Sequence, residues 1–164
     1  MATNKFYKAV LTTGLIAGAL DATAASIQYY INTGKEPARV FRYVASAVLG
    51  KEAVTKDLYT MAAWGLLFHL IIAMTWALIF FLFFRQIRSV LKNKFVAGIV
   101  YALFVWCIMN FLVVPLAFGM DLGMQATSLF SPARLKSSLI AMGILIIAIG
   151  LPISLLADRY YSKK

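Results

Sequence analysis

Three strongly polar residues, Asp21, His69 and Asn110, lie inside segments of the chain that are otherwise apolar. Each lies roughly 8–11 residues from the end of its segment that would face the same side of a membrane. In a bilayer this common depth predicts one layer near the midplane that contains a carboxyl, an imidazole and a carboxamide group. Polar groups are costly at that depth, and they normally face one another or a water-filled cavity.

Asp21 is the strongest functional candidate of the three. A carboxylate at the midplane costs free energy unless it is paired or protonated, so its chemistry would be the handling of a proton or a cation. His69 next to such an acid suits a proton relay, because imidazole titrates near neutral pH. The alternative is that Asp21 and His69 only fasten helices together. Asn110 suits either an interhelical hydrogen bond or a donor that orients a ligand.

Four apolar segments have to position these residues. The chain has 164 residues, of which 62% are hydrophobic, against about 45–50% in soluble domains. A membrane-spanning helix needs about 20 apolar residues, and four segments reach that length: 9–31, 58–84, 95–118 and 138–157. We therefore predict an all-α membrane protein with four transmembrane helices, which forms a single domain over residues 1–164.

The connections between the spans differ in character. The first outer connection contains another apolar stretch, residues 37–49, which is too short to cross a bilayer. Pro37 suits a first helical turn, and Gly50 suits the position just after a helix end. This stretch predicts a short interfacial or re-entrant helix. The second outer connection, residues 119–137, contains two Gly and one Pro and is predicted to be irregular.

Basic residues set the predicted orientation. The net charge of +10 would suit binding to nucleic acid. However, the Lys and Arg residues gather at the ends of the apolar segments, so nucleic acid is not expected as a partner. The link between the second and third spans contains four bases and no acid: Arg85, Arg88, Lys92 and Lys94. Under the positive-inside rule this link and both termini are cytoplasmic. We expect these four bases to contact anionic lipid headgroups, at about 1 kcal/mol for each charge.

The count of charges supports the same orientation. Nine of the sixteen basic residues lie on the predicted cytoplasmic side. The other seven are spread over longer outer loops that also contain four acids.

Small residues predict where the helices pack. Gly14 and Gly18 lie on the same face of the first span as Asp21, and Gly65 lies one turn before His69 on the second span. Because small residues let helix backbones approach closely, these two faces are predicted to meet and to bring the acid within reach of the imidazole. Small-residue faces left exposed also predict a homodimer or a larger oligomer.

Two prolines and one cysteine lie in the last two spans. Pro115 and Pro152 each free a carbonyl about four residues earlier, which predicts kinks near Phe111 and Ala148. Cys107 is the single cysteine, so an internal disulfide is excluded. It is predicted to be a small buried apolar residue.

Enzymatic chemistry finds little support in this sequence. An intramembrane aspartyl protease needs two facing acids, and only Asp21 lies in a predicted span. A serine protease needs a nucleophile beside its base, and Ser26, on the first span, is expected to lie closer to the outer boundary than to His69. One His and one Cys make no zinc-binding pattern. We therefore expect no cofactor and no metal.

Five strings resemble a bacterial family of small four-span inner-membrane proteins of unknown function. They are GLIAGALD at 14–21, ASAVLGK at 45–51, GLLFH at 65–69, MNFLVVPL at 109–116 and GLPI at 150–153. The resemblance implies four helices and a bacterial inner-membrane location, and it implies no activity.

The sequence leaves three functions open. The first is a non-enzymatic membrane protein that binds or passes a small solute, ion or proton through a polar midplane cavity, with Asp21 as the titrating group and His69 as its partner. The second is a structural or accessory membrane subunit whose buried polar residues only lock the helix bundle. The third is a lipid-modifying membrane enzyme. Four helices are few for a monomeric transporter, so conduction is expected to need an oligomer.

Overall fold

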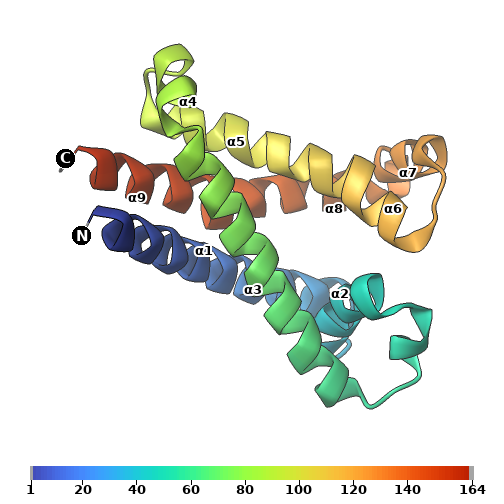
Figure 1. Ribbon diagram of the computed structural model, residues 1–164. Coiled ribbons are helices and arrows are strands. Elements are labelled where there is room, and N and C mark those ends of the chain that lie inside the picture. Colours follow the sequence, from blue (N-terminus) through green and yellow to red (C-terminus); the bar gives the residue numbers. More distant parts are fainter. Residues whose placement is uncertain (1, 163–164) are drawn as a thin grey trace.

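The computed structural model describes residues 2–162, and every regular element in them is a helix. Four helical segments are long and apolar enough to cross a membrane: Asn4–Thr33, Leu58–Leu82, Lys94–Phe118 and Pro132–Tyr161. Figure 1 shows them as the four long rods of the molecule. This confirms the predicted all-helical architecture with four long apolar helices. The fourth helix begins six residues before the predicted boundary at 138, and the second ends at Leu82 rather than at 84.

Helices α1 (Ala2–Thr33) and α3 (Leu58–Leu82) pack through the small-residue face of α1. A Cβ atom on Gly14 would lie 2.6 Å from the Cα of Met74, and one on Gly18 would lie 2.8 Å from the Cβ of Ala73. Only glycine therefore allows these backbones to come so close. Both glycines are buried in this contact, so neither is exposed for the contact between copies that the sequence suggested.

The predicted extra helix is present as α2 (Ala38–Leu49), followed by the 3₁₀ turn η1 (Lys51–Val54). Gly50 ends α2 with a φ of +89°, a conformation that glycine adopts at little cost. Helix α2 lies against α3, and a Cβ atom on Gly65 would overlap the carbonyl oxygen of Phe41. Gly65 therefore faces α2, and the prediction that it faces the first span is wrong.

Short elements link the second and third long helices. Helix α3 begins at an Asp57 cap, whose Oδ2 accepts a hydrogen bond of 2.8 Å from the backbone N–H of Thr60. After α3 the chain forms α4 (Phe84–Val90) and then α5 (Lys94–Ile108). Asn93 caps α5, because its Oδ1 accepts from the N–H of Phe95 at 2.8 Å. The basic link is thus largely helical.

A π-helical turn precedes each membrane-segment proline. The turn η2 (Met109–Val113) leads into α6 (Val114–Phe118), which contains Pro115. The turn η3 (Ile146–Gly150) joins α8 (Pro132–Leu145) to α9 (Leu151–Tyr161), which contains Pro152. The wider turns occupy the places where each proline removes an α-helical hydrogen bond.

The second long connection is ordered, so the prediction of an irregular segment over 119–137 is wrong. It contains α7 (Leu122–Leu129), and α8 begins within it at Pro132. Asp121 caps α7, because its Oδ1 accepts from the N–H of Met124 at 3.0 Å. Proline is well suited to a first helical turn, where its missing N–H would have no partner in any case.

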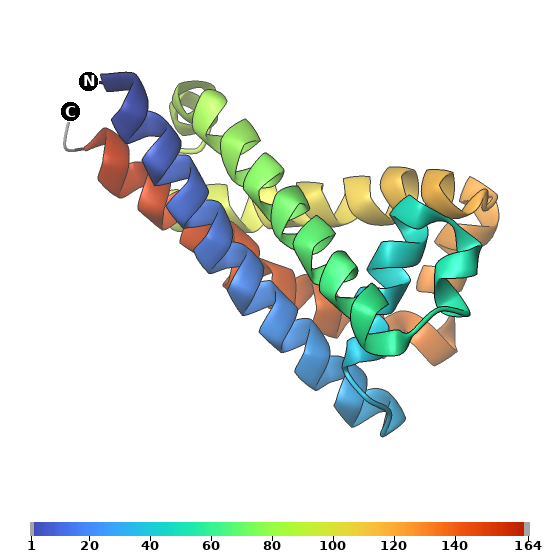
Figure 2. The same cartoon turned by 60° about the horizontal axis from the view of Figure 1, so that its bottom comes forward.

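The main core lies at the end of the bundle where the chain begins and ends (Figure 1). Its largest members are aromatic side chains with at most 7% exposure: Phe80, Phe81, Phe84 and Tyr101. Tyr101 donates a hydrogen bond of 2.6 Å to the carbonyl oxygen of Trp76. Figure 2 shows that the helices lie closest near the termini and diverge toward the end that carries α2 and α7. This aromatic core closes one end of the molecule.

Candidate functional site

The three polar residues predicted to form one layer line a common cavity. Asp21 of α1, His69 of α3 and Asn110 of η2 all border a cavity of about 190 Å³, which we call the polar cavity. Val44 of α2 and Trp76 of α3 belong to its otherwise apolar and aromatic wall. The cavity lies where the helices begin to diverge from the aromatic core.

Asp21 and His69 form a close pair at the wall of the polar cavity. The Nε2 atom of His69 lies 3.5 Å from Oδ2 of Asp21, and the two side chains are only 18% and 14% exposed. The same Nε2 lies 3.3 Å from the carbonyl oxygen of Gly18. Because a carbonyl oxygen only accepts hydrogen bonds, Nε2 carries the hydrogen and directs it between Gly18 and Asp21. In the neutral ring Nδ1 is then the basic nitrogen.

Neighbouring contacts hold the imidazole in this position. Gly18 brings α1 against Ala73, which lies one turn after His69 on α3. On the other side, the Phe41 ring of α2 meets the His69 ring edge to face, with centroids 6.1 Å apart. Gly65, one turn before His69, allows the Phe41 backbone to come that close. The ring is therefore held by the Gly18 carbonyl of α1 and by the Phe41 ring of α2.

Asn110 lines the cavity without a hydrogen bond to the Asp21–His69 pair. Its Nδ2 donates at 2.9 Å to the carbonyl oxygen of Trp106, in its own helix, so this bond does not join two helices. Asn110 and Trp106 also border a second cavity of about 310 Å³, which we call the loop-side cavity. Arg134, Ser137 and Ser138 contribute polar groups to a wall that also contains Leu129 and Ala141. Asn110 and Trp106 thus border both cavities.

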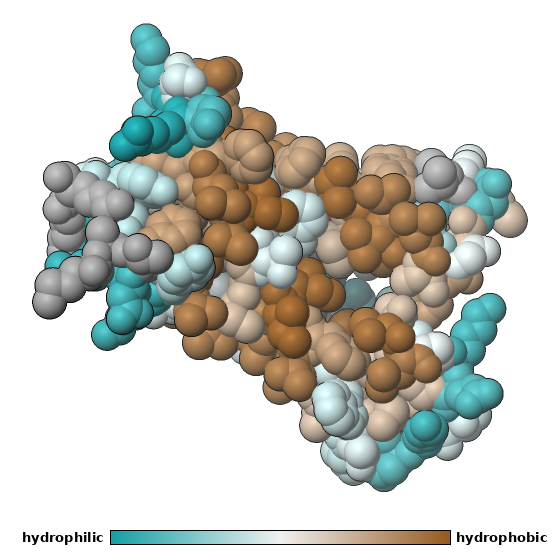
Figure 3. All heavy atoms as spheres, viewed as in Figure 1, coloured by the Kyte–Doolittle hydropathy of each residue, from teal (hydrophilic) through white to brown (hydrophobic). Residues whose placement is uncertain are grey.

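The surface is hollowed near these cavities. Figure 3 shows mostly hydrophobic atoms over the long helices, interrupted by a hollow between α2 and the α5–α6 segment with hydrophilic atoms inside it. Hydrophilic side chains otherwise gather at the two ends of the molecule (Figure 3). This distribution fits a multi-pass membrane protein.

Two of the four basic residues predicted to contact lipid form ion pairs with a carboxylate. Nη2 of Arg88 lies 3.5 Å from Oδ1 of Asp158, and Nζ of Lys94 lies 3.4 Å from its Oδ2. This cluster joins α4, α5 and α9. Arg85 and Lys92 are exposed. Sequence reasoning missed Asp158, although a single acid just after the last span, on the side of the basic link, was a signal for such a pair.

The prediction that Cys107 is buried is wrong, because its side chain is exposed on α5. It lies on a helix surface that is rich in exposed apolar residues such as Leu103 and Phe104, where a small soft side chain is easily accommodated. Within residues 2–162, no three His, Cys, Asp or Glu side chains are grouped closely enough to hold a metal ion.

The arrangement is suited to acid–base chemistry without a metal. A carboxyl group and an imidazole lie side by side at the wall of a small, largely apolar space. One can donate a proton and the other can accept it. Comparison of the chain with protein-family models, curated proteins and solved structures found no match.

Proposed function

We propose that this chain is a multi-pass membrane protein that binds and passes protons through the polar cavity. The proposal rests above all on one observation. A carboxyl–imidazole pair with 14% and 18% exposure lines a cavity of about 190 Å³ among four long apolar helices. Ionisable residues at membrane depth are costly, and they mark ion or proton pathways more often than simple packing contacts.

The proton is the ligand that this cavity suits best among small solutes and ions. Among the described residues that line it, Asp21 is the only one with a carboxylate, and most of the wall is apolar. A Ca²⁺ or Mg²⁺ ion would need six or more oxygen ligands or a retained water shell, which one carboxylate and one carboxamide do not replace. A proton needs only one acceptor at a time.

The geometry of His69 supports a relay. The proton on Nε2 points toward Gly18 and Asp21. A second proton arriving from the cavity binds at Nδ1, and the resulting imidazolium releases its Nε2 proton to the Asp21 carboxylate. Asp21 then releases this proton onward, and the ring, which now carries its hydrogen on Nδ1, regains its first tautomer by turning over. Asp21 and His69 thus act in series.

The route has an open side and a closed side. Asn110 and Trp106 border both the polar cavity and the loop-side cavity, whose wall includes Arg134. On the opposite side the aromatic core fills the bundle. We propose that protons reach the pair from the loop side, and that passage across the membrane requires the core helices to move or a second copy of the chain to take part.

We propose a bacterial inner-membrane location, with both termini and the link that carries Arg85 and Lys92 in the cytoplasm. The four bases of that link, with no acid among them, favour this orientation. The family resemblance of the sequence favours the membrane. Arg85 and Lys92 are exposed, so they remain the proposed contacts for anionic headgroups.

A second function has an observation of its own. The contacts of His69 with Gly18 and Asp21 join α3 to α1, which is what a purely structural lock in an accessory subunit would do. Interhelical hydrogen bonds in membranes contribute roughly 0.6–2 kcal/mol. Substitutions that remove the proton-binding capacity and keep the hydrogen bonding distinguish the two functions. They should abolish proton passage, but they should leave a structural lock largely intact.

The decisive experiment measures proton flux into liposomes that contain the purified protein, with a pH-sensitive dye inside and an imposed pH gradient. We would compare the wild type with Asp21→Asn, His69→Gln and the matched control Glu52→Gln, which removes a carboxylate from an exposed position in η1. We expect wild-type flux above that of empty liposomes, roughly tenfold lower flux in the first two variants, and unchanged flux in the control.

Unfolding midpoints in detergent are measured for the same four proteins. Absence of flux in a folded wild type, or equal flux in Asp21→Asn, would overturn the proton-passing function. If wild-type flux is absent and both site variants are strongly destabilised, the result favours the structural lock.

A further inference from the structure

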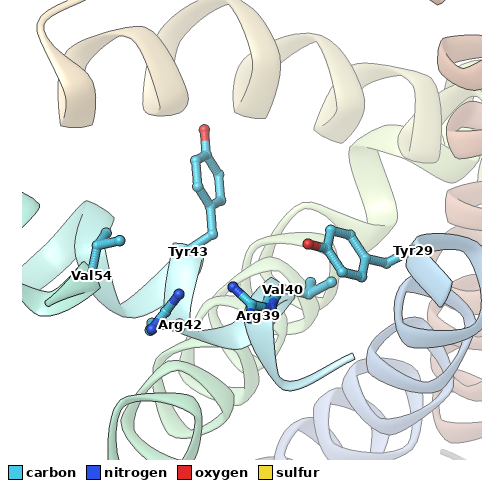
Figure 4. Close-up of a pocket in the computed structure, with 6 residues that line it drawn as sticks. All are labelled: Tyr29, Arg39, Val40, Arg42, Tyr43 and Val54. Atoms are coloured by element: carbon cyan, nitrogen blue, oxygen red, sulfur yellow. The ribbon is translucent and has the colours of Figure 1, made fainter. Parts of the chain in front are cut away.

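A third cavity, separate from the polar cavity and the loop-side cavity, lies between α1, α2 and η1. It has a volume of about 360 Å³ and is bordered by Tyr29, Arg39, Val40, Arg42, Tyr43 and Val54. Figure 4 shows these six side chains, and we call the cavity the arginine pocket. We propose that the arginine pocket binds a phosphate group through Arg39 and Arg42.

The two guanidinium groups of the pocket are not neutralised by protein carboxylates. Arg39 and Arg42 are three residues apart on α2, so they share a helix face. In the part of the chain that the structure describes, neither has a carboxylate oxygen within 4.0 Å, whereas Arg88 and Lys94 share Asp158. Two acids of the same connection have other partners, since Glu36 accepts a hydrogen bond of 3.5 Å from the Tyr59 hydroxyl and Asp57 caps α3. Two uncompensated positive charges on one concave surface favour an anion.

Further groups of the pocket add to this preference. Figure 4 shows the hydroxyl group of Tyr29 pointing from α1 toward Arg39 and Val40, where it is placed to donate to a bound oxygen. Burial raises the pKa of the Tyr43 phenol, and the positive charge of Arg134 offsets part of this rise, so a third cation lies close to the pocket. The positive potential therefore extends beyond the two arginines.

Most of the remaining wall of the pocket is apolar. The Tyr43 ring stacks on Phe118 of α6, with centroids 4.7 Å apart and an angle of 19° between the ring planes. Val40 and Val54 complete this wall. A pocket whose wall combines cations with apolar groups suits an anion that is attached to an apolar body as well as a free anion.

Phosphate fits these groups better than a carboxylate does. A guanidinium group offers a planar fork of N–H donors that pairs with two oxygens. A carboxylate satisfies one fork, whereas a phosphate group has enough oxygens and charge for two forks and a hydroxyl donor. Free inorganic phosphate and the phosphate of a lipid headgroup share this chemistry. Because α2 is the predicted interfacial helix, either kind of phosphate can reach a pocket beside it.

The test is a binding titration of the full-length protein in a detergent without phosphate. One arm uses inorganic phosphate, and the other uses dihexanoyl phosphatidic acid, which carries the same group on a short lipid. The key variant is Arg39→Gln/Arg42→Gln. Its matched control is Lys51→Gln/Lys56→Gln, which removes two exposed charges from the same connection outside the pocket. We expect the key variant to bind about tenfold more weakly or worse, and the control to bind like the wild type.

Arg39→Lys/Arg42→Lys and Tyr29→Phe keep the test decisive if the key variant does not fold. The first keeps both charges and loses the forks, and the second loses only the hydroxyl, so each is expected to weaken binding by a smaller factor. Binding in one arm only identifies free phosphate or a lipid headgroup as the source. No binding in either arm would overturn the proposal. Equal losses of affinity in Arg39→Gln/Arg42→Gln and in the control Lys51→Gln/Lys56→Gln would also overturn it.

Discussion

The position of His69 does not depend on the charge of Asp21. Its Nε2 hydrogen also faces the carbonyl oxygen of Gly18 at 3.3 Å, and the Phe41 ring lies against the other side of the imidazole. A change that neutralises Asp21 should therefore leave the ring in place. This separation of position from charge is what allows an isosteric amide at Asp21 to report on proton transfer rather than on folding.

Asp57 offers a residue-scale test of pH dependence outside the spans. Hydrogen bonds from the backbone N–H groups of the first turn of α3, above all that of Thr60, hold the pKa of Asp57 below its usual value. A carboxyl group with a depressed folded-state pKa stabilises the fold above its unfolded pKa, and this stabilisation is lost as the pH falls through the folded value. Asp57→Asn keeps an acceptor at the cap but does not titrate.

We therefore expect the wild type to be more stable than Asp57→Asn at about pH 7, and the difference to shrink toward about pH 3. The measurement is the unfolding midpoint of both proteins in detergent across that range. A difference that stays constant with pH would contradict the assigned role of the carboxylate.

At the scale of elements, glycine contacts decide how closely α2 and α1 approach α3. At Gly65 the backbone of α2 lies where a side chain would otherwise be. We expect Gly65→Ala to destabilise the protein by roughly 1–3 kcal/mol, because overpacking forces α2 away from α3. Hydrogen exchange of residues 38–49 should rise in parallel, since α2 is held mainly by α3.

Gly143→Ala is the matched control for that substitution. Gly143 lies inside α8, and nothing would lie within 4 Å of its Cβ atom. Alanine is the better helix former by about 1 kcal/mol, so this variant should be as stable as the wild type or more stable. Equal losses in both variants would mean that the close contact at Gly65 is not what holds α2.

Sequence patterns predicted the elements that periodicity and length define. Small residues at helical spacing placed Gly14 and Gly18 on the face that meets α3, and with them the approach of Asp21 to His69. The crossing of α5 and η3 was missed, where a Cβ atom on Gly150 would overlap the carbonyl oxygen of Gly98. Those glycines lie in different spans, so no local spacing connects them.

The remaining errors have a related cause. Whether Asn110 bonds within its own helix or across to another depends on the π turn that contains it, and the sequence shows only a proline five residues later. The partner of Gly65 depends on how α2 folds back, which is a tertiary contact. The helix α7 within the connection 119–137 is short and carries its own cap at Asp121, so hydrophobicity alone does not reveal it.

At the scale of the whole molecule, the two ends of the bundle differ. The end with the termini contains the aromatic core, in which Phe84 and Tyr161 stack with centroids 4.4 Å apart. The other end is more open and contains the loop-side cavity and the arginine pocket. Both cavities therefore lie at the end that the positive-inside rule predicts to be outside. The orientation of the chain decides from which side of the membrane ligands would reach them.

Cysteine labelling in intact bacterial cells tests that orientation. In a Cys107→Ser background, which removes the exposed native thiol, single cysteines replace Lys56, in the first outer connection, or Ser89, in the basic link; both positions are exposed. With the basic link inside, a membrane-impermeant maleimide should label position 56 in intact cells and position 89 only after permeabilisation. The reverse pattern would place the loop-side cavity and the arginine pocket on the cytoplasmic side, so protons and phosphate would reach them from the cell interior.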